Sequence, residues 1–479
     1  MKLDESQSFF LEKFKDHTKN FDVDFMILTG SAGTGKTELI KECVEYLKNN
    51  NFGHQCLAFT GRAASVLRSR GLENASTITS WLYRLNNKDT HEKKLNPFDN
   101  FIFFIDESSM ISNSAIIFDD KEPVLDFQLD EIMWSTFRHI KCKNILFVFV
   151  GDKNQLPPIR HDYCPALNED YLSNRYGLIG KSYSLKTMHR QTSESNIPKL
   201  AENFLSFDNE FSRAIPPIAE IEKDVQIIDN SEVVDIFFDL YFEDKHDVKI
   251  ITATNKKADY YNFLIKEKLS TGKSKYFTPY QIPKDNLEPQ KGDILQIFKN
   301  SRNRNYEIFN GQFLEVLELG RVTETILKKG NSIFDNIPFI TQQLKVDTIS
   351  DSGERDSKPI FIEISIDHLV NSYVLTKQEY EYFEDRDVGM LNKIRTYIES
   401  IQNSKKIYYD KSYNPVLTRY GYAITGHKAQ GGGWKNIIID FSGFNKDGGH
   451  LPPSWIYTAI TRAKSNLFIA NYPTEENNE

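Results

Sequence analysis

Eight residues near the N-terminus have the types and spacing of a phosphate-binding loop. Residues 30–37 read GSAGTGKT, follow an apolar run at 25–29 and precede a helix-like pattern of apolar residues. Glycines let backbone N–H groups curl around phosphate oxygens, a lysine at this spacing reaches the β- and γ-phosphates, and the following threonine hydroxyl can ligate Mg²⁺. A glycine turn between packed elements would not account for the Lys-Thr pair. We therefore expect a nucleoside triphosphate site built from Gly33, Thr34, Gly35, Lys36 and Thr37.

Two further polar motifs follow apolar, strand-like runs. The run 101–105 ends in Asp106 and Glu107, and the run 146–150 is followed by GDKNQLPP, which contains Gln155. Beside a P-loop, the first carboxylate can hold Mg²⁺ through its water shell and the second can orient and deprotonate a water molecule. We expect Asp106 to be a metal ligand, Glu107 to be the base, and Gln155 to sense the γ-phosphate. The alternative is a pair of acids that open a turn or helix.

Length and composition indicate a multidomain globular protein. A chain of 479 residues is too long for one hydrophobic core, so two to four domains are expected. A hydrophobic fraction of 39%, with 34 Phe and 23 Tyr, is enough for burial and excludes a disordered chain. The formal net charge of −8 does not exclude a basic groove, because nucleic-acid binding depends on local potential.

Cysteine usage and hydropathy indicate a soluble, cytoplasmic protein. The four cysteines form no C-x-x-C pair and have no histidine at a zinc-site spacing, so we expect reduced thiols. The N-terminus has no apolar signal core, and the longest apolar runs have the length of strands. No membrane association is expected.

The arrangement of apolar runs predicts an α/β fold. Short runs that are apolar on both faces recur at 25–29, 56–60, 101–105 and 146–150, as expected for buried parallel strands. A second set occurs at 248–253, 437–439 and 467–470. Between them the pattern alternates, with a turn at Asn310-Gly311, which predicts an antiparallel β module. Residues 376–406 have helical spacing and many charges but no clear place in this scheme.

The motifs GSAGTGKT, DESSM and GDKNQLPP, in this order, resemble those of superfamily 1 helicases, and most closely the superfamily 1B branch of RecD-like and Dda-like proteins. The resemblance extends from Gln7 to Arg462. It implies two RecA-like P-loop NTPase domains with an inserted SH3-like module, ATP and Mg²⁺ as cofactors, and 5′→3′ movement on single-stranded DNA with duplex unwinding. The implied boundaries are 1–190 for the first domain, 191–284 and 419–479 for the second, and 285–418 for the module.

The resemblance also implies further contacts with the nucleotide. Gln7 resembles the glutamine that reads the adenine edge, although a solvated surface residue is the alternative. Arg190, in LKTMHRQ, and Arg462, in YTAITRA, resemble arginines that reach the γ-phosphate, with a surface ion pair as the alternative for each. Gln430 and Gly431 resemble residues that approach the nucleotide.

Another set of residues resembles the family's contacts with the DNA strand. These are Thr60, Arg62, Thr79, Asn255, Thr425 and His427. Arg62 could instead cap a helix or pair with an acid, and the family often has His where this chain has Thr79. The residues 432–434, Gly-Gly-Trp, also depart from the usual polar continuation of their motif. Trp81 is expected in the core.

Strand separation requires a wedge, and the resemblance places a small pin in residues 83–100. Phe98 is one possible tip, and an ordinary surface loop is the alternative. In the inserted module, Lys299, Arg302 and Arg304 could meet phosphates or could form a solvated charged loop.

Three rival functions remain open at this point. An RNA helicase or nucleoprotein remodeller is one, because no motif here reads the 2′-hydroxyl. A non-motor NTP-dependent switch is another, and it predicts no stimulation by single strands. A helicase–nuclease is the third, and its nuclease activity would have to come from a partner. The expected partners are single-stranded DNA, DNA duplex junctions and a replication or repair protein.

Overall fold

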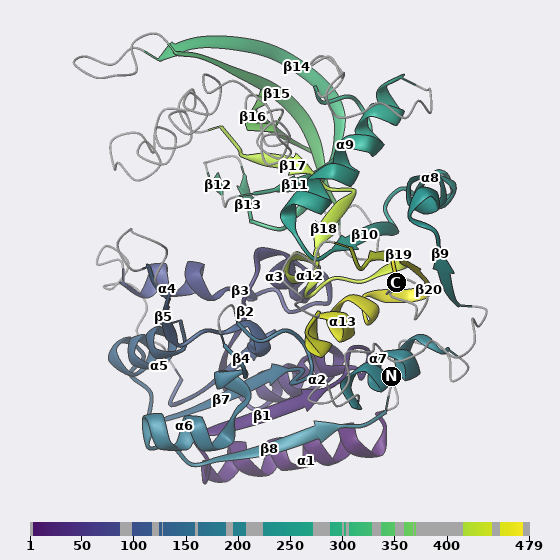
Figure 1. Ribbon diagram of the computed structural model, residues 1–479. Helices are drawn as coiled ribbons and strands as arrows, with labels where there is room; N and C mark the ends of the chain where they lie inside the picture. The colour runs from purple at the N-terminus through teal and green to yellow at the C-terminus, as the bar shows by residue number, and fades with distance from the viewer. Residues whose placement is uncertain are drawn as a thin grey trace. The chain divides into compact units, whose positions relative to one another are not determined.

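The computed structural model describes most of the chain. The described residues are 3–86, 98–116, 124–126, 128–158, 161–187, 195–206, 224–271, 288–298, 301–302, 306–327, 337–349, 359–366, 368–369, 415–442 and 451–472. The chain divides into two compact units (Figure 1). The first unit comprises Met1–Val225, Gln430–Gly433 and Leu451–Asn466, and the second comprises Gln226–Ala429, Trp434–His450 and Leu467–Glu479.

The first unit is built on a parallel six-stranded sheet of order β3-β2-β4-β7-β1-β8. Four of its strands overlap the apolar runs predicted at 25–29, 56–60, 101–105 and 146–150. The strands are β1 (Phe25–Gly30), β2 (Gly53–Ala58), β3 (Ser76–Thr77), β4 (Asn100–Asp106), β7 (Asn144–Gly151) and β8 (Gly180–Leu185).

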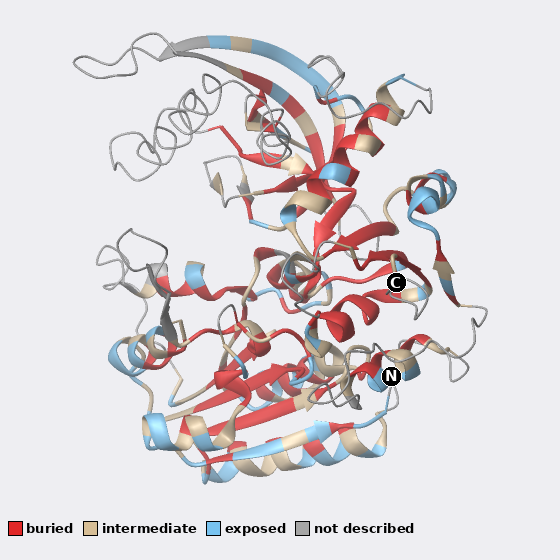
Figure 2. Cartoon of the chain, viewed as in Figure 1, coloured by how far each residue is buried: buried red, intermediate tan, exposed pale blue. Residues whose placement is uncertain are grey.

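Helices cover both faces of this sheet, which explains why its strands are apolar on both sides (Figure 2). In β1, Met26 and Leu28 join the core on one face, whereas Phe25 and Ile27 join the core on the other. The first face is covered by α1 (Glu5–Asn20), α2 (Lys36–Asn49) and α3 (Gly61–Ser69). The second is covered by α4 (Ile78–Asn86), α5 (Gln128–His139) and α6 (Glu169–Tyr176). Trp81 lies in this second core, as predicted.

Smaller elements complete the first unit. Helix α7 (Ile197–Ser206) packs against α13 (Pro453–Ile460), which returns from the C-terminal part of the chain. A short antiparallel pair is formed by β5 (Ser114–Ile116) and β6 (Val124–Asp126), and single 3₁₀ turns occur at Ser108–Met110 and Pro165–Leu167.

The second unit contains a five-stranded sheet of order β18-β10-β19-β20-β9. Strand β10 pairs in parallel with both of its neighbours, β18 and β19, as expected for an α/β unit. The strands are β9 (Val225–Ile228), β10 (Val248–Thr252), β18 (Ala423–Thr425), β19 (Trp434–Asp440) and β20 (Ala463–Ala470). The helical segments are a 3₁₀ turn (Asn230–Glu232), α8 (Val233–Glu243), α9 (Asn255–Thr271) and α12 (Gly426–Ala429).

An antiparallel sheet is inserted between α9 and β18. Its order is β16-β15-β14-β11-β17, and adjacent strands pair in antiparallel orientation. Gly311, with φ of 84°, supplies the turn before β14, at the predicted Asn-Gly position. The strands are β11 (Ile294–Ile297), β14 (Phe313–Leu327), β15 (Ile337–Ile349), β16 (Ile360–Ser365) and β17 (Thr418–Tyr420), with a small hairpin of β12 (Ser301–Arg302) and β13 (Glu307–Ile308). The predicted antiparallel insertion is therefore confirmed.

A buried ion pair joins the inserted sheet to α9 within the second unit. Lys266 on α9 donates to Asp293 Oδ2 at 2.6 Å, and the Tyr422 hydroxyl donates to Asp293 Oδ1 at 2.9 Å. Lys266 and Asp293 are both buried. Desolvation lowers the pKa of Lys266, and the charge of Asp293 opposes that change. Each charge is stable in this environment only while its partner is present.

Several predicted features fall on residues that the structure does not describe. Most of the pin segment, at 87–97, is outside the described residues, as are Lys299, Arg304, the side chain of Arg302 and residues 376–406. The domain boundaries at 190, 284 and 418 remain predictions. Among the described residues, no helix combines the length and the hydropathy needed to cross a bilayer.

The Lys266–Asp293 pair predicts a large difference between two lysines of α9. Lys266→Met should lower the free energy of unfolding by about 3 kcal/mol, because it leaves a buried carboxylate without its partner. Lys268→Met removes a lysine whose partner Asp235 is 63% exposed, and it should cost at most about 1 kcal/mol. Urea denaturation of the two variants measures both values, and equal losses would contradict the role of the buried pair.

Candidate nucleotide-binding site

The strand order of the first unit brings three sequence motifs to one edge of its sheet. Strand β7 lies between β1 and β4, and the three strands run in parallel. Their carboxyl ends therefore lie side by side, which is where ligands bind in open α/β sheets. Loop 30–37 follows β1, Glu107 follows β4 and Asp152 follows β7.

The loop after β1 has the backbone of a phosphate cradle. Gly33 and Gly35 have φ values of 90° and 78°, in the left-handed region that favours glycine. A Cβ atom on Gly30 would lie 2.6 Å from Thr34 Oγ1, so this position also requires glycine. Helix α2 begins at Lys36, directly after this loop, and a helix N-terminus favours an anion such as phosphate.

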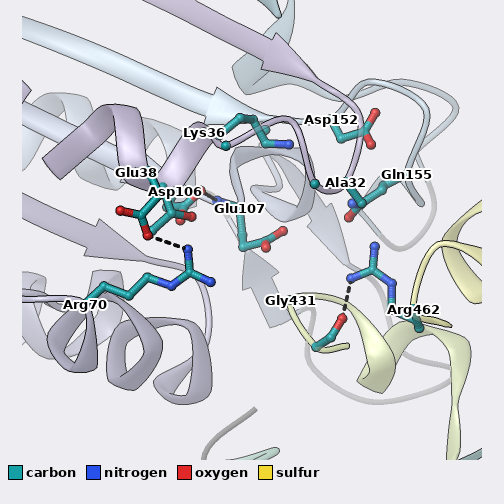
Figure 3. A pocket seen from close by; sticks show the side chains of 15 residues that line it. Ala32, Lys36, Glu38, Arg70, Asp106, Glu107, Asp152, Gln155, Gly431 and Arg462 are labelled. Atoms are coloured by element: carbon teal, nitrogen blue, oxygen red, sulfur yellow. Dashed lines mark hydrogen bonds and ion pairs between the residues drawn. The ribbon is translucent and has the colours of Figure 1, made fainter. Parts of the chain in front are cut away.

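A cavity of about 300 Å³ lies among these elements, within the first unit (Figure 3). This volume is at the lower end of the range for small-molecule sites. Of the residues predicted from sequence, nine line it: Gly33, Gly35, Lys36, Thr37, Asp106, Glu107, Gln155, Gly431 and Arg462. The other lining residues are Ala32, Glu38, Arg70, Gly151, Asp152 and Gly432.

Lys36 is held by the loop that it belongs to. Its Nζ donates to Gly30 O at 2.7 Å and to Ser31 O at 2.9 Å. Both acceptors are backbone carbonyls of the cradle, so the ammonium lies at the wall of the cavity. Figure 3 shows the side chain along this wall. A phosphate group in the cradle would be a stronger, charged acceptor for the same donor.

Two adjacent carboxyl groups face the cavity at the end of β4. Burial raises the pKa of Asp106, whereas its hydrogen bond from Glu107 N, at 2.9 Å, and the charges of Lys36 and Arg70 oppose this. Burial and the neighbouring Asp106 raise the pKa of Glu107 to about 7, against the charges of Arg462 and Lys36. A carboxyl group with a pKa near neutrality can accept and return a proton at physiological pH.

The backbone at Glu107 is in an uncommon conformation. Its φ of 55° and ψ of 37° place it in the left-handed region, and a 3₁₀ turn follows directly. This conformation costs about 1 kcal/mol or more for a non-glycine residue. It turns the carboxyl group into the cavity, close to Gly431, where a Cβ atom would lie 3.6 Å from Glu107 Oε1.

Gln155 presents a buried polar atom without a partner. The residue is 5% exposed and lines the cavity, and its Oε1 atom has no hydrogen-bond partner among the described residues. Leaving such a group unsatisfied costs about 1–3 kcal/mol. A ligand, a water molecule or a metal-bound water in the cavity would satisfy it.

Arg462 is fixed in place by groups of the same unit. Its Nε donates to Thr458 O at 2.9 Å, Nη1 donates to Gly432 O at 2.9 Å, and Nη2 donates to Thr461 Oγ1 at 3.0 Å. The guanidinium lines the cavity and is 3% exposed. It is not the surface ion pair that was the alternative for this residue.

The segment that carries Arg462 is tied to the loop after β7. The Tyr457 hydroxyl donates to Asp152 Oδ2 at 2.9 Å, Leu156 N donates to Thr458 Oγ1 at 3.0 Å, and Gln430 Nε2 donates to Leu156 O at 3.1 Å. These bonds give Gln430 a structural contact beside the cavity. It is not one of the residues that line it.

Gln7 and Thr34 are buried next to the phosphate loop. Gln7 Nε2 donates to Thr34 O at 3.0 Å, and Gln7 Oε1 accepts from Asp4 N at 3.1 Å in the capping box of α1. The alternative of a solvated surface residue is therefore wrong for Gln7. Its contact with adenine stays a prediction. Thr34 Oγ1 donates to Ser31 O at 2.9 Å, inside the loop.

The predicted strand contacts of the first unit lie at helix starts. Thr60 is the N-cap of α3, and its Oγ1 accepts from Ala63 N at 3.0 Å. Thr79 is exposed in the first turn of α4. The side chain of Arg62 and the whole of Arg190 fall outside what the structure describes, so their roles stay predictions.

In the second unit, the predicted strand contacts cluster at the carboxyl edge of the parallel sheet. Thr425 ends β18 and pairs in register with Thr252 at the end of β10. Asn255 begins α9 just after β10 and is exposed, and His427 on α12 is also exposed. Thr425 itself is 7% exposed.

Three charged residues of the cavity were not found from the sequence. Asp152 is part of the GDKNQLPP motif, whose position after a strand was a usable signal. Glu38 directly follows Thr37, in the first turn of α2. Arg70 lies at the end of α3, more than thirty positions from the phosphate loop, and no local pattern marks it.

Comparisons with known proteins agree with this geometry. A family model described as an AAA domain matches residues 17–120, and one described as a UvrD-like helicase C-terminal domain matches residues 420–470. The RecBCD enzyme subunit RecD of Buchnera aphidicola (subsp. Schizaphis graminum) is 25% identical over 93% of this chain and 70% of its own length. A solved structure of Pif1 helicases at forked double-stranded DNA has the same fold, with a TM-score of 0.51 at 17% identity, covering 99% of this chain and 94% of that one.

The chain is therefore similar to the RecD subunit in sequence and to Pif1 helicases in fold. The predicted fold class, two RecA-like domains with an inserted antiparallel module, is confirmed. An uncharacterized protein of Methanocaldococcus jannaschii is 26% identical over 92% of the chain, and the chain spans 36% of the length of that relative.

The electrostatics of Glu107 predict a pH-dependent effect on stability. Because its pKa in the fold is raised from 4.5 to about 7, the ionised form is disfavoured, and its contribution to stability falls as pH rises through this window. Glu107→Gln should therefore raise the free energy of unfolding by about 1–3 kcal/mol at pH 8, and by much less at pH 5.

Denaturant unfolding at the two pH values measures this difference. Glu12→Gln is a matched control, because that side chain is 69% exposed and should show no comparable gain. A loss of stability for Glu107→Gln at pH 8 would contradict a desolvated carboxylate at this position.

Proposed function

We propose that this chain is an ATP-dependent DNA helicase that moves 5′→3′ on single-stranded DNA and unwinds duplexes. The observation that carries the proposal is the grouping of one lysine, two adjacent carboxyl groups and one buried arginine around a single cavity at a P-loop. This set is what phosphoryl transfer to water requires.

The residues of the cavity fit Mg²⁺-bound ATP. The left-handed glycines let backbone N–H groups face a triphosphate, and the unpartnered Gln155 Oε1 could accept from the attacking water. Thr37 and Asp106 are the hydroxyl and carboxylate that would hold Mg²⁺. When bound, ATP and Mg²⁺ supply the γ-phosphoryl group and the charge that neutralises its oxygens.

The chain's own residues then have separate tasks. Lys36 leaves its loop carbonyls for the β- and γ-phosphate oxygens, and Glu107 accepts the proton of the attacking water at its carboxylate. Arg462, already held in place, stabilises the charge that develops on the γ-phosphate oxygens. Arg190 is proposed as a second such arginine, from the family resemblance alone.

On the strand side, we propose contacts by Thr60, Arg62 and Thr79 in the first unit. In the second unit the proposed contacts are Asn255, Thr425 and His427. Hydrolysis would produce movement if each unit held the strand with different strength before and after phosphate release. The RecD relative is named as a subunit of a larger enzyme, which supports a replication or repair protein as a partner of this chain.

Two substitutions separate binding from hydrolysis. Lys36→Ala should abolish ATP hydrolysis and weaken ATP binding, because it removes the cation at the phosphates. Glu107→Gln should bind ATP normally but lower the strand-stimulated rate at least about 100-fold, because it removes the base. Nucleotide titration and phosphate release measure the two effects, and full turnover by either variant would refute the site assignment.

Direction and substrate are tested by strand displacement. With ATP, wild-type protein should unwind duplexes that carry a 5′ single-stranded tail and should leave those with a 3′ tail intact. Single-stranded DNA should stimulate ATP hydrolysis more than RNA of the same sequence. Unwinding from the 3′ tail would reverse the polarity, and stronger stimulation by RNA would favour the RNA helicase. An ATPase indifferent to any strand would be a non-motor switch.

A further inference from the structure

Arg70 brings a third cation to the nucleotide cavity. It is the C-cap residue of α3, and its side chain lines the cavity with Lys36 and Arg462. Figure 3 shows its guanidinium pointing toward Glu38 and Asp106. Neither the P-loop nor the motifs of the family resemblance include this residue, and nothing in the roles above uses it.

The contact between Arg70 and Glu38 is weak. Arg70 Nη1 donates to Glu38 Oε1 at 3.2 Å, and both side chains are 38% exposed. An ion pair this exposed contributes about 0–1 kcal/mol to stability. The pair can therefore be exchanged for a stronger one at little cost.

The three cations differ in how firmly they are held. Arg462 makes three hydrogen bonds to groups of its own unit, and Lys36 makes two to the P-loop. Within the described part of the chain, Arg70 makes a single one, to Glu38, and its charge also acts on Asp106. Of the three, Arg70 is the cation that can move with the least loss of existing bonds.

Glu38 is placed to act as a temporary partner. It directly follows Lys36 and Thr37 in the first turn of α2, where the helix dipole favours a negative charge. The carboxylate is therefore stable without Arg70. Because Glu38 adjoins Thr37, the Arg70 side chain that pairs with Glu38 is already close to the phosphate end of the site.

We propose that Arg70 leaves Glu38 when a nucleoside triphosphate binds and pairs with its γ-phosphate. This inference rests on the proposed function only in requiring that the cavity binds ATP. The Arg70 guanidinium can donate two parallel N–H hydrogen bonds to phosphate oxygens, whereas Glu38 accepts only one hydrogen bond from it. Arg70 then distinguishes the triphosphate from the diphosphate, which lacks the group that it contacts.

The test compares nucleotide affinities, independently of turnover. Wild-type protein, Arg70→Gln, Arg70→Lys and Glu38→Gln are titrated by calorimetry with Mg²⁺-ADP and with a non-hydrolysable Mg²⁺-ATP analogue. Arg70→Gln should weaken analogue binding about tenfold to a hundredfold and change ADP binding less than twofold, because one charged contact is lost. Arg70→Lys should recover part of the loss.

Glu38→Gln is the control that separates this proposal from a structural ion pair. It breaks the same pair but leaves Arg70 free, so the affinity for the analogue should stay equal or increase. If Glu38→Gln and Arg70→Gln weaken binding alike, or if Arg70→Gln weakens ADP and analogue equally, the proposal is overturned. The proposal is also overturned if Arg70→Gln binds Mg²⁺-nucleotide more tightly than wild type does. That result would mean that the Arg70 cation competes with Mg²⁺ for the site and does not contact the γ-phosphate.

The unwinding assay tests the proposed helicase function independently of the nucleotide titrations. Wild-type protein that discriminates the nucleotides through Arg70 but fails to unwind any tailed duplex would retain this inference and refute the helicase. If wild-type protein unwinds DNA and Arg70→Gln binds both nucleotides as wild type does, the helicase function is retained and the inference about Arg70 is refuted. Absence of any nucleotide binding would refute both.

Discussion

The candidate site of the first unit depends on two adjacent carboxyl groups that are shielded from water at the end of a buried strand. Burial raises the pKa values of Asp106 and Glu107, and the Asp106 carboxylate makes Glu107 harder to ionise. Such a site is stable only if cations surround it, and Lys36, Arg70 and Arg462 supply them. The same electrostatic strain that costs stability prepares Glu107 to take up a proton near neutral pH.

Backbone geometry explains why these groups meet. The carboxyl ends of β4, β7 and β1 are neighbours in one parallel sheet, so the loop after each strand opens on the same side. The P-loop needs glycine where φ is positive, and Glu107 accepts a left-handed conformation in order to face the cavity. A site of this kind follows from strand order as much as from the chemistry of its side chains.

The second unit accommodates a large insertion, the antiparallel sheet between α9 and β18. The inserted antiparallel sheet is joined to α9 by the buried pair of Lys266 and Asp293, and the Tyr422 hydroxyl next to β18 completes the contact. These residues come from the three segments that enter and leave the insertion. The insertion therefore forms a continuous structure with the unit that carries it.

The phosphate loop, the carboxylates after β4 and the fold class could be predicted from sequence patterns alone. These features depend on short-range spacing, because a P-loop, a strand end and an apolar run are each local patterns. Three other features are visible only in the folded chain: Gln7 is a buried capping residue, Arg462 is held by backbone carbonyls, and Arg70 reaches the cavity. Those contacts join residues far apart in the chain, and strand order and helix packing, which no local pattern encodes, bring them together.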